Sequence, residues 1–530
     1  MKKGVVDMGK YSFKTIRNAI VFGMCMVISA GLLAGPGQTV TLKAASGRPQ
    51  LMRGSLYLSE RAEDDSGLYL DAFHDSLRLT PESAAAFPAL NKALEDYRTD
   101  SEKKAKEMAE EYLKQRKEHP ENVYDEQVPY AIQNQCCVRR ADETAVSFLY
   151  SDYSYAGGVH GGTDVSSGNY DTGSGKEILL NDIVKEKDGL VEALKKELVE
   201  KYGENTFFPE MPETLAKEVR QEDDLKLTWV LEPQGVCFFF SPYEIGPYAS
   251  GVLSVTLPYT SYGDLFTENY RPAEDAGASV EMLDYETLDL DVDRDGKIDR
   301  ISVDRELDDE GDVITGVKIK VNDQELSPSK GKGDLYYYSM NQMIFLTADG
   351  KAWLYLFGLT DNDYSSIDIY DLSSGKAAFV DSVDLAVSSC DVEGEDDLNY
   401  SAVLTDPDLM PLTKRFDILS TYSGSKTFKL ADNGLPESSD PYYMIKGKIQ
   451  LKSKKDIHLD RVDEKGNVTK KNVTVPSGST FDLYRTDGEK VLDARLKDGS
   501  LVRFIVEGTY PALIDGVNAE DLFEELFYAG

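Results

Sequence analysis

Histidine is scarce in this chain, and so are the motifs of common enzyme active sites. The four histidines, at positions 74, 119, 160 and 458, are never close in sequence, which excludes HExxH zinc chemistry. No GxSxG elbow occurs, and TGSGKE at 172–177 is not a phosphate loop because Tyr170 replaces its first glycine. A pair of carboxylates that hydrolyses glycosides stays an open alternative, since some pair is inevitable among 94 acidic residues. Nothing selects one pair, so the sequence predicts no catalytic residue.

Cysteine is too sparse for a fold held together by disulfides. Outside the leader described next, only Cys136, Cys137, Cys237 and Cys390 remain. A bond between the adjacent Cys136 and Cys137 would be strained. Pairing of one of them with Cys237 stays open, and buried free thiols are the expected state.

Long apolar runs are also rare, and the single candidate lies near the N-terminus. Five basic residues precede the uncharged run AIVFGMCMVISAGLLAG at 19–35. This order is typical of a secretory signal peptide, predicted here over residues 1–45 with cleavage after Ala44. An uncleaved anchor is the alternative, because the run is just long enough to cross about 30 Å of hydrocarbon. No later stretch is comparable, so no membrane span is predicted after cleavage.

Basic residues are outnumbered, with 58 Lys and Arg against 94 Asp and Glu, which gives a formal net charge of −36. Such a surface repels nucleic acid and anionic lipid, and it attracts cationic partners and divalent metal ions. Solubility alone is the simpler explanation of the overall charge. Nucleic acid is therefore not an expected partner.

Length and pattern predict three folded domains after the leader. The expected fold is an α+β domain over 46–270, then a β-rich domain over 271–435 and a β-rich domain over 436–530 that ends in a short helix. Linker-like stretches, RPAEDAGA and NGLPESSDP, separate the three. The alternating runs of the middle domain fit either a sandwich or a partial propeller.

Several elements can be placed within this outline. Strands are predicted at 227–231, 236–240 and 252–257, and a glycine-dense hairpin tip within 145–184. A helix or helix pair is predicted from Pro81 to Pro120, with an apolar stripe of Leu90, Leu94, Tyr97, Ala105, Met108 and Tyr112. The last helix is predicted to start at the N-cap Asn518 and to bury Leu522, Phe523, Leu526 and Phe527.

The stretch DLDVDRDGKID at 289–299 places carboxylates at alternate positions and a glycine where the chain must reverse. Counted from position 1, the predicted calcium ligands are Asp291, Asp293, Asp295, the Lys297 carbonyl and Asp299. The helix-loop-helix version needs a glutamate at position twelve, where Ser302 stands, and the residues that follow alternate as in a strand. The loop therefore resembles the strand-loop-strand calcium loops of propeller-type proteins. An aspartate-rich turn in an acidic chain is the simpler alternative.

Two further segments carry a family resemblance. GGVHGGTDVSSGNYDTGSGKEILLNDIV and, later in the chain, GVCFFFSPYEIGPYASGVLSVTLPY resemble the extracellular domain shared by lysozyme-sensing anti-sigma factors of the RsiV type and PdaC-type peptidoglycan deacetylases. The resemblance covers residues 50–265 and implies an extracellular binding and sensing module. It does not imply deacetylation, because the His-x-x-x-His pair of the deacetylase module is missing.

The leader, the aspartate loop and the resemblance together predict a secreted or surface-exposed, non-catalytic binding protein of a bacterium. Its expected partner is a cell-wall component or a basic protein such as lysozyme, with calcium as a structural ion. The candidate binding surface comprises His160, Tyr243, Glu244 and Tyr248, although a structural histidine and a packed aromatic corner are the alternatives. Alternative functions are a cell-wall glycan-modifying enzyme and a membrane-anchored envelope-stress sensor. The sensor is disfavoured because 18 residues before the apolar run are too few for a sigma-binding segment.

Overall fold

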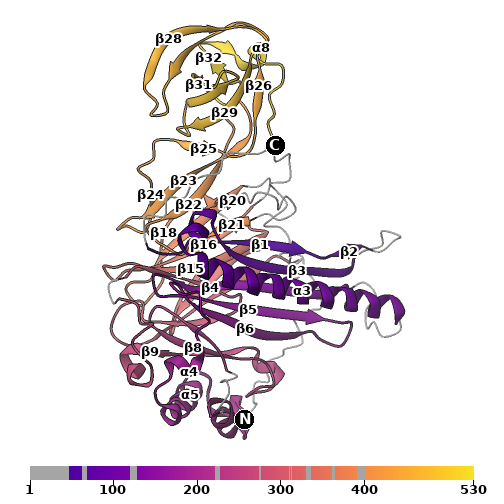
Figure 1. Ribbon diagram of the computed structural model, residues 1–530, viewed down its shortest axis with the longest axis vertical. Helices are drawn as coiled ribbons and strands as arrows, with labels where there is room; N and C mark the ends of the chain where they lie inside the picture. The colour runs from indigo at the N-terminus through magenta and orange to yellow at the C-terminus, as the bar shows by residue number, and fades with distance from the viewer. Residues whose placement is uncertain are drawn as a thin grey trace.

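The computed structural model describes residues 47–61, 68–119, 128–220, 227–273, 276–309, 311, 313–329, 336–360, 364–390 and 400–529. The predicted leader at 1–45 lies outside these residues. The molecule is elongated, with the residues after 450 at one end and the helices between 180 and 220 at the other (Figure 1). Within the described part of the chain, no helix is long and apolar enough to cross a membrane.

An eight-stranded sheet forms the centre of the N-terminal part. Seven strands follow the order β20-β21-β1-β3-β4-β5-β6, and β2 pairs with β3. The bounds are β1 (Leu51–Tyr57), β2 (Glu60–Arg61), β3 (Leu68–Leu79), β4 (Tyr130–Ala141), β5 (Ala145–Tyr155), β6 (Gly162–Asp171), β20 (Ser389–Cys390) and β21 (Tyr400–Val403). The pair of β3 and β4 is parallel, so the chain between them must cross over the sheet.

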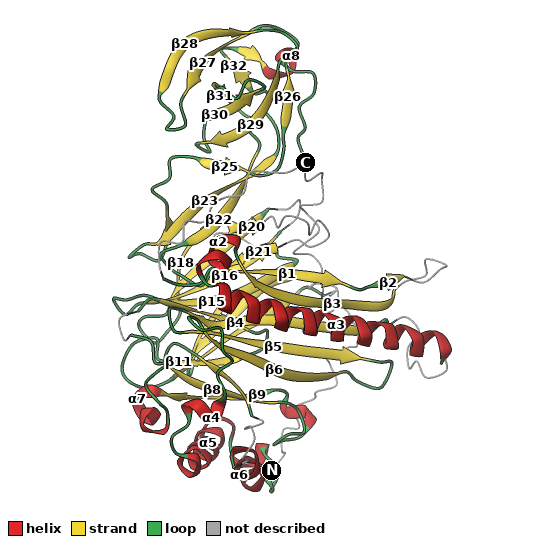
Figure 2. Cartoon of the chain, in the orientation of Figure 1, coloured by secondary structure: helices red, strands yellow, loops and turns green. Residues whose placement is uncertain are grey.

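The predicted helix pair makes this crossover, as α2 (Pro81–Ala86) and α3 (Pro88–Glu118). Thr80 begins α2 as its N-cap, because its side-chain oxygen accepts the Ser83 N–H at 3.4 Å. The long helix α3 lies along the face of the sheet and covers it (Figure 2). The pair ends at Glu118, two residues before Pro120, as the sequence predicts.

The predicted apolar stripe of α3 is confirmed at three positions, where Leu90, Leu94 and Ala105 are buried. It is wrong at Met108, whose side chain is 44% exposed. Ala109 is buried in its place, which shows that the buried face has shifted by one residue in the second half of this 31-residue helix.

A second, smaller sheet lies beside the first, and the helices between residues 180 and 219 lie on its outer face (Figure 2). Its order is β7-β8-β9, close to the three predicted strands. The buried residues of this layer form one core that includes Trp229. The bounds are β7 (Thr228–Leu231), β8 (Gly235–Phe240), β9 (Leu253–Pro258), α4 (Leu180–Ile183), α5 (Lys187–Tyr202) and α6 (Met211–Val219). Short helical turns occur at Glu204–Thr206, Tyr248–Ser250, Tyr259–Tyr262 (α7) and Gly263–Leu265.

The middle part contains two antiparallel sheets, with the orders β10-β15-β16-β17-β18 and β11-β12-β13-β14. Residues of both sheets, such as Val280 and Ile301, share a single buried core. This arrangement is that of a sandwich. The bounds are β10 (Ala278–Met282), β11 (Thr287–Leu290), β12 (Asp299–Leu307), β13 (Ile314–Val321), β14 (Gln324–Ser329), β15 (Ser339–Leu346), β16 (Ala352–Leu359), β17 (Ser365–Asp371) and β18 (Ala378–Val383).

The C-terminal part is a curled, extensively paired sheet with the path β19-β22-β23-β25-β29-β30-β31-β27-β28. Its bounds are β19 (Ala386–Val387), β22 (Met410–Phe416), β23 (Tyr422–Leu430), β24 (Pro436–Glu437), β25 (Tyr443–Ile445), β26 (Gln450–Lys452), β27 (Ile457–Val462), β28 (Val468–Val475), β29 (Thr480–Thr486), β30 (Val491–Leu496), β31 (Leu501–Glu507), β32 (Leu513–Ile514) and β33 (Val517–Asn518). The predicted final helix is one turn, α8 (Ala519–Leu522), and Asn518 caps it by accepting the Glu520 N–H at 3.0 Å. Phe527 is 61% exposed, so its predicted burial is wrong because the helix stops before reaching it.

Strand pairing crosses the predicted segment boundaries. Leu51 of β1 lies opposite Val403 of β21, so the middle of the chain adds strands to the N-terminal sheet. Likewise, Gly424 of β23 lies opposite Ile445 of β25. The three segments predicted from sequence therefore share sheets, although an α+β N-terminal part followed by mostly β structure is observed.

Cys136, Cys137 and Cys237 are buried free thiols, which is the state expected from the sequence. Burial raises the pKa of all three thiols. These cysteines therefore act as small apolar core residues.

Candidate functional site

The aspartate loop at 289–299 connects β11 to β12. The two strands pair up to Leu290 and Asp299, which lie opposite one another and fix the ends of the loop. The chain reverses through Arg294 and Gly296, whose φ angles are 57° and 87°. The glycine takes this left-handed conformation without steric cost, so the strand-loop-strand geometry predicted from the sequence is observed.

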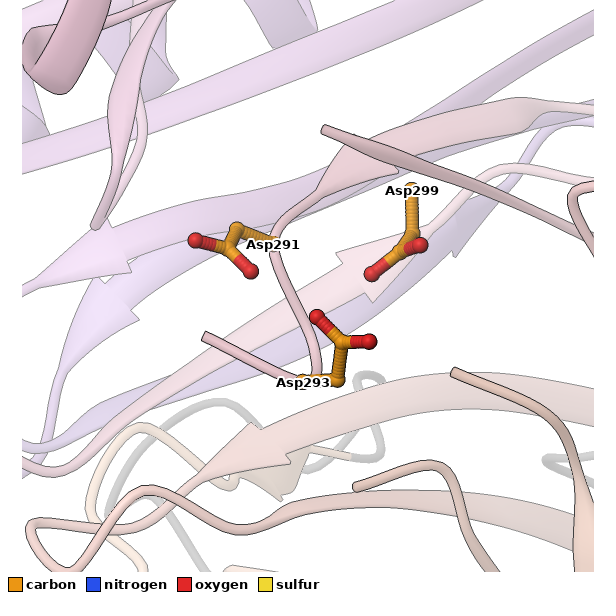
Figure 3. A group of neighbouring side chains, drawn as sticks. All are labelled: Asp291, Asp293 and Asp299. Atoms are coloured by element: carbon orange, nitrogen blue, oxygen red, sulfur yellow. The ribbon is translucent and has the colours of Figure 1, made fainter. Parts of the chain in front are cut away.

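Three carboxylates of the loop converge (Figure 3). Asp291, Asp293 and Asp299 each offer an oxygen, and these oxygens lie within 4.8 Å of one another. Asp299 is held from both sides, because its Oδ2 accepts the Val292 N–H at 3.1 Å and its Oδ1 accepts Asn322 Nδ2 at 2.6 Å. The set offers only hard oxygen atoms, which are the ligands that calcium prefers.

Asp291 is the least satisfied member of the group. Its Oδ2 accepts the Gly296 N–H at 2.9 Å, but its buried Oδ1 has no hydrogen-bond partner in the described residues. Burial, and then the charges of Asp293, Asp295 and Asp299, raise the pKa of this carboxyl above its usual value. A bound cation would partner the orphaned oxygen and remove the repulsion, so the residues fit calcium.

The carboxylate of Asp295, predicted as a ligand, is not part of the converging group. It accepts hydrogen bonds from the Lys297 backbone at 2.8 Å and from Lys297 Nζ at 2.9 Å, and these bonds lower its pKa. The role of the Lys297 carbonyl stays a prediction. The structure therefore brings together three of the four predicted carboxylate ligands.

The loop is attached to the three-stranded sheet of the N-terminal part. Gln234, in the turn between β7 and β8, accepts the Asp291 N–H at 2.7 Å and donates to the Asp291 carbonyl at 2.9 Å. At the first residue of the loop, Lys201 of α5 forms a buried ion pair with Asp289 at 2.8 Å. Neither contact is signalled by the sequence, because both join residues more than 50 positions apart.

A second attachment is made by Arg139 of β4, which is fully buried. Its Nη2 contacts Glu232 at 2.6 Å and Glu286 at 2.7 Å, and both carboxylates are buried as well. Glu232 belongs to the same turn as Gln234, and Glu286 immediately precedes β11. The aspartate loop is thus fixed to the N-terminal part on two sides.

The candidate binding residues from the sequence also come together. The ring of His160, at the tip of the β5–β6 hairpin, stacks on Tyr248 with centroids 4.2 Å apart, and Tyr243 lies 5.8 Å from Tyr248. The Tyr248 hydroxyl donates to the Gly161 carbonyl at 2.8 Å, which ties the hairpin tip to the segment after β8. These three residues are called the aromatic surface below.

The turn that presents Tyr243 is held by its neighbours. Tyr243 has a φ of 72°, a left-handed conformation that is rare for a bulky residue, and its side chain is 60% exposed. Its N–H donates to the Gly246 carbonyl at 3.0 Å, and Glu244 Oε2 accepts the Ser241 N–H at 2.8 Å. An exposed ring in a strained turn is typical of a functional position.

Glu244 is half-buried beneath the turn and carries an altered pKa. Burial raises it above the usual value, and the charges of Glu218 and Asp164 raise it further. The Ser241 N–H lowers it in part. Glu218 and Asp164 are therefore close enough to Glu244 for their charges to act on its carboxyl beside the aromatic surface.

Two family models match the segments that carry the aromatic surface. Residues 80–163, which contain α3, the β5 strand and His160, match the family model of the deacetylase PdaC. Residues 177–260, which contain β7, β8 and Tyr248, match the DUF3298 family, whose function is unknown. The matches confirm the predicted resemblance and identify a cell-envelope-related module. No curated protein matches the chain.

Two solved structures of DUF3298 proteins are similar to part of this chain. The protein from Bacteroides fragilis is 15% identical with a TM-score of 0.31, covering 42% of this chain and 96% of its own. The protein from Pseudomonas aeruginosa is 18% identical with a TM-score of 0.28, covering 41% of this chain and 96% of its own.

Proposed function

We propose that this chain is a secreted or cell-surface binding protein of a bacterium that recognises its ligand through the aromatic surface and catalyses no reaction. The proposal rests on the contacts of the rings of His160 and Tyr243 with the ring of Tyr248, at a place where His160 and Tyr243 are exposed. Two matched segments supply these rings, one from each family. Tyrosines that are held in place before binding lose little conformational entropy and are enriched among residues that dominate binding energy.

A basic protein such as lysozyme is the favoured partner. Glu244, Asp164 and Glu218 place negative charge beside the rings, on a chain whose net charge is −36. Complementary charge speeds encounter and selects a cationic partner, whereas the rings supply the contact area. A cell-wall glycan is the second candidate, and the similarity to PdaC-type deacetylases supports it.

Interferometry with immobilised lysozyme and with peptidoglycan fragments tests the proposal directly. The chain from residue 47 onward should bind one of the two at low salt, and Tyr243→Ala should abolish most of the signal. Tyr510→Ala is the matched control, because Tyr510 is 82% exposed in the C-terminal part. Absence of binding to both probes, or equal losses in the two variants, would discard the proposal.

We further propose that the aspartate loop binds one structural calcium ion through Asp291, Asp293 and Asp299. The orphaned, buried oxygen of Asp291 supports this assignment. An extracellular calcium module of this kind binds at about 10⁻⁴ to 10⁻³ M. Calcium would then fix the junction that Gln234 and Lys201 make between the sandwich and the N-terminal part.

Calorimetry and thermal unfolding of the same chain test the calcium site. Millimolar calcium should give a binding heat and raise the unfolding temperature, and magnesium at the same concentration should do neither, because it demands a smaller octahedral site. No heat and no thermal shift with millimolar calcium would refute the site and leave the aromatic surface unaffected.

A further inference from the structure

Charge is distributed very unevenly along this acidic chain. Residues 47–435 contain 38 basic and 76 acidic residues, whereas residues 446–471 contain nine basic and four acidic residues. The excess of lysine falls in the C-terminal part, which neither family model covers. A local reversal of charge needs an explanation that solubility of the whole chain does not give.

Five of the eight lysines in 446–471 lie on or beside the ribbon formed by β27 and β28. The two strands pair from Ile457 opposite Val475 to Val462 opposite Val468. β28 is the edge strand of its sheet, and it lies at the end of the molecule farthest from α4 and α5 (Figure 1). We call the following exposed residues the lysine ribbon: Lys454, Lys455, Lys465, Lys470 and Lys471.

Three of the four acidic residues of the ribbon bond the backbone, and the fourth, Glu464, accepts a hydrogen bond from the Tyr484 hydroxyl and lies 3.4 Å from Arg495. Asp456 accepts the Ser477 N–H at 2.8 Å, and Asp460 accepts the Asn472 N–H at 2.8 Å. Asp463 accepts two N–H groups in the turn between the strands. Their positions are therefore fixed by turn geometry and not by the lysines.

The central lysines keep their charge available. Among the described residues, Lys455, Lys470 and Lys471 form no ion pair within 4 Å, although Lys454 donates to the Glu520 carbonyl. Protection of a sheet edge is the simplest reason for lysine on β28. It does not account for Lys454 and Lys455, which lie in the turn before β27 and not on the edge strand.

The shape of the ribbon indicates what it fits. At about 3.3 Å per residue, the charges from the turn before β27 to Lys470 extend over roughly 20 Å along one narrow strand pair. Lysines are flexible point charges that suit repeated single contacts, whereas a pocket for one phosphate favours the rigid fork of arginine. A flat lipid surface needs a broad basic face, and the rest of the chain is acidic.

We propose that the lysine ribbon binds a linear phosphodiester polymer of the bacterial envelope. This contact is separate from the aromatic surface, which lies in the N-terminal part, so each can fail without the other. Binding of this kind is driven by release of counterions and weakens steeply with salt. It would hold an otherwise acidic protein against an anionic wall.

A synthetic glycerol phosphate oligomer serves as the probe, titrated against the chain from residue 47 onward by interferometry at several salt concentrations. The triple variant Lys455→Gln, Lys470→Gln, Lys471→Gln should weaken binding at least tenfold. It should also reduce the slope of log affinity against log salt by about 2, because each lost phosphate contact contributes about 0.7.

The control removes three charges elsewhere, through Lys106→Gln, Lys114→Gln and Lys195→Gln on the helices α3 and α5. These lysines are exposed, and the control should bind like the unaltered chain. Equal thermal unfolding of all three proteins excludes a folding defect. The proposal is overturned by no binding of the oligomer at low salt, by equal losses in both variants, or by stronger binding to phosphatidylglycerol vesicles at equal phosphate concentration.

Discussion

The aspartate loop and the aromatic surface are encoded in opposite ways. The four predicted carboxylate ligands of the loop lie within nine residues of one hairpin, from Asp291 to Asp299. The aromatic surface exists only after folding, since 87 residues separate Gly161 from Tyr248, whose hydroxyl binds it. A local motif can therefore be predicted from its spacing, whereas an assembled surface is predicted only through resemblance to a family that already folds this way.

The two regions nevertheless depend on the same framework. Gln234 joins the loop to the turn between β7 and β8, and β8 leads directly into the segment of Tyr243 and Tyr248. Arg139 connects that turn to the start of the sandwich. The loop and the aromatic surface therefore differ in how far apart their residues lie in the sequence, but the same turn between β7 and β8 supports both. Variants can test these two statements separately.

The largest expected effect comes from Arg139→Met, which tests the shared framework. Removal of this buried cation leaves Glu232 and Glu286 buried without their partner, so the free energy of unfolding should fall by about 3–5 kcal/mol. The only two tryptophans, Trp229 in β7 and Trp353 in β16, report on the two sides of the junction. Urea unfolding followed by fluorescence of single-tryptophan variants should show both transitions moving.

The control for Arg139→Met also replaces Glu232 and Glu286 by glutamine. Because no unpaired charge then remains buried, much of the lost stability should return. If Arg139→Met moved the Trp229 transition and left the Trp353 transition in place, the two regions would not share a framework.

The next largest effect is on calcium-dependent stability. It distinguishes the three carboxylates that converge in the structure from the four that the sequence pattern predicts as ligands. At calcium concentrations about a hundredfold above the dissociation constant, binding should stabilise the chain by about 2.7 kcal/mol. Asp291→Asn should abolish this gain, as its carboxylate lies in the converging group. Asp295→Asn should keep most of it, because Asp295 bonds Lys297 instead. Thermal unfolding with and without calcium measures both, and equal losses would favour the full pattern of alternating ligands.

A smaller effect is expected at the aromatic surface. Tyr243→Ala should weaken lysozyme binding by about 2 kcal/mol, the cost of truncating a central aromatic contact. The loss should be the same with calcium and with a chelator, since no residue of the loop touches Tyr243 in the described structure. Interferometry in the two buffers gives the comparison. A loss that appears only with calcium would mean that the loop controls the surface.

The parts of the fold that the sequence predicts are those whose contacts join residues close together in the chain. The helix pair ending before Pro120, the three strands around Trp229 and the Asn518 cap were predictable, because each depends on neighbours in the chain. The predicted burial of Met108 is wrong, because the buried face of a 31-residue helix drifts relative to a fixed spacing.

The contacts that position the site could not be predicted. Lys201 and Asp289 look like ordinary surface charges in an acidic chain, and only the fold buries them together. The pairing of β1 with β21 joins residues about 350 positions apart, and a strand carries no signal for its partner in its own sequence. Asp295 fits the calcium pattern by its position in the sequence. Its carboxylate nevertheless bonds the ammonium group of Lys297, two residues later.

The smallest expected effect is a pH dependence at the aromatic surface. Burial, Glu218 and Asp164 raise the pKa of Glu244, so this carboxyl takes up a proton at a higher pH than an ordinary glutamate. Its protonated form stabilises the fold at low pH, and that contribution is lost as the pH rises through the raised pKa.

A cationic partner favours the charged form of Glu244, so affinity should fall as the pH falls through the same range. Glu244→Gln should bind less tightly at pH 7 by less than about 1 kcal/mol and should lose this part of the pH dependence. Interferometry from pH 7 to pH 4.5 checks it, and an unchanged profile in the variant would show that the surface selects its partner by the rings alone.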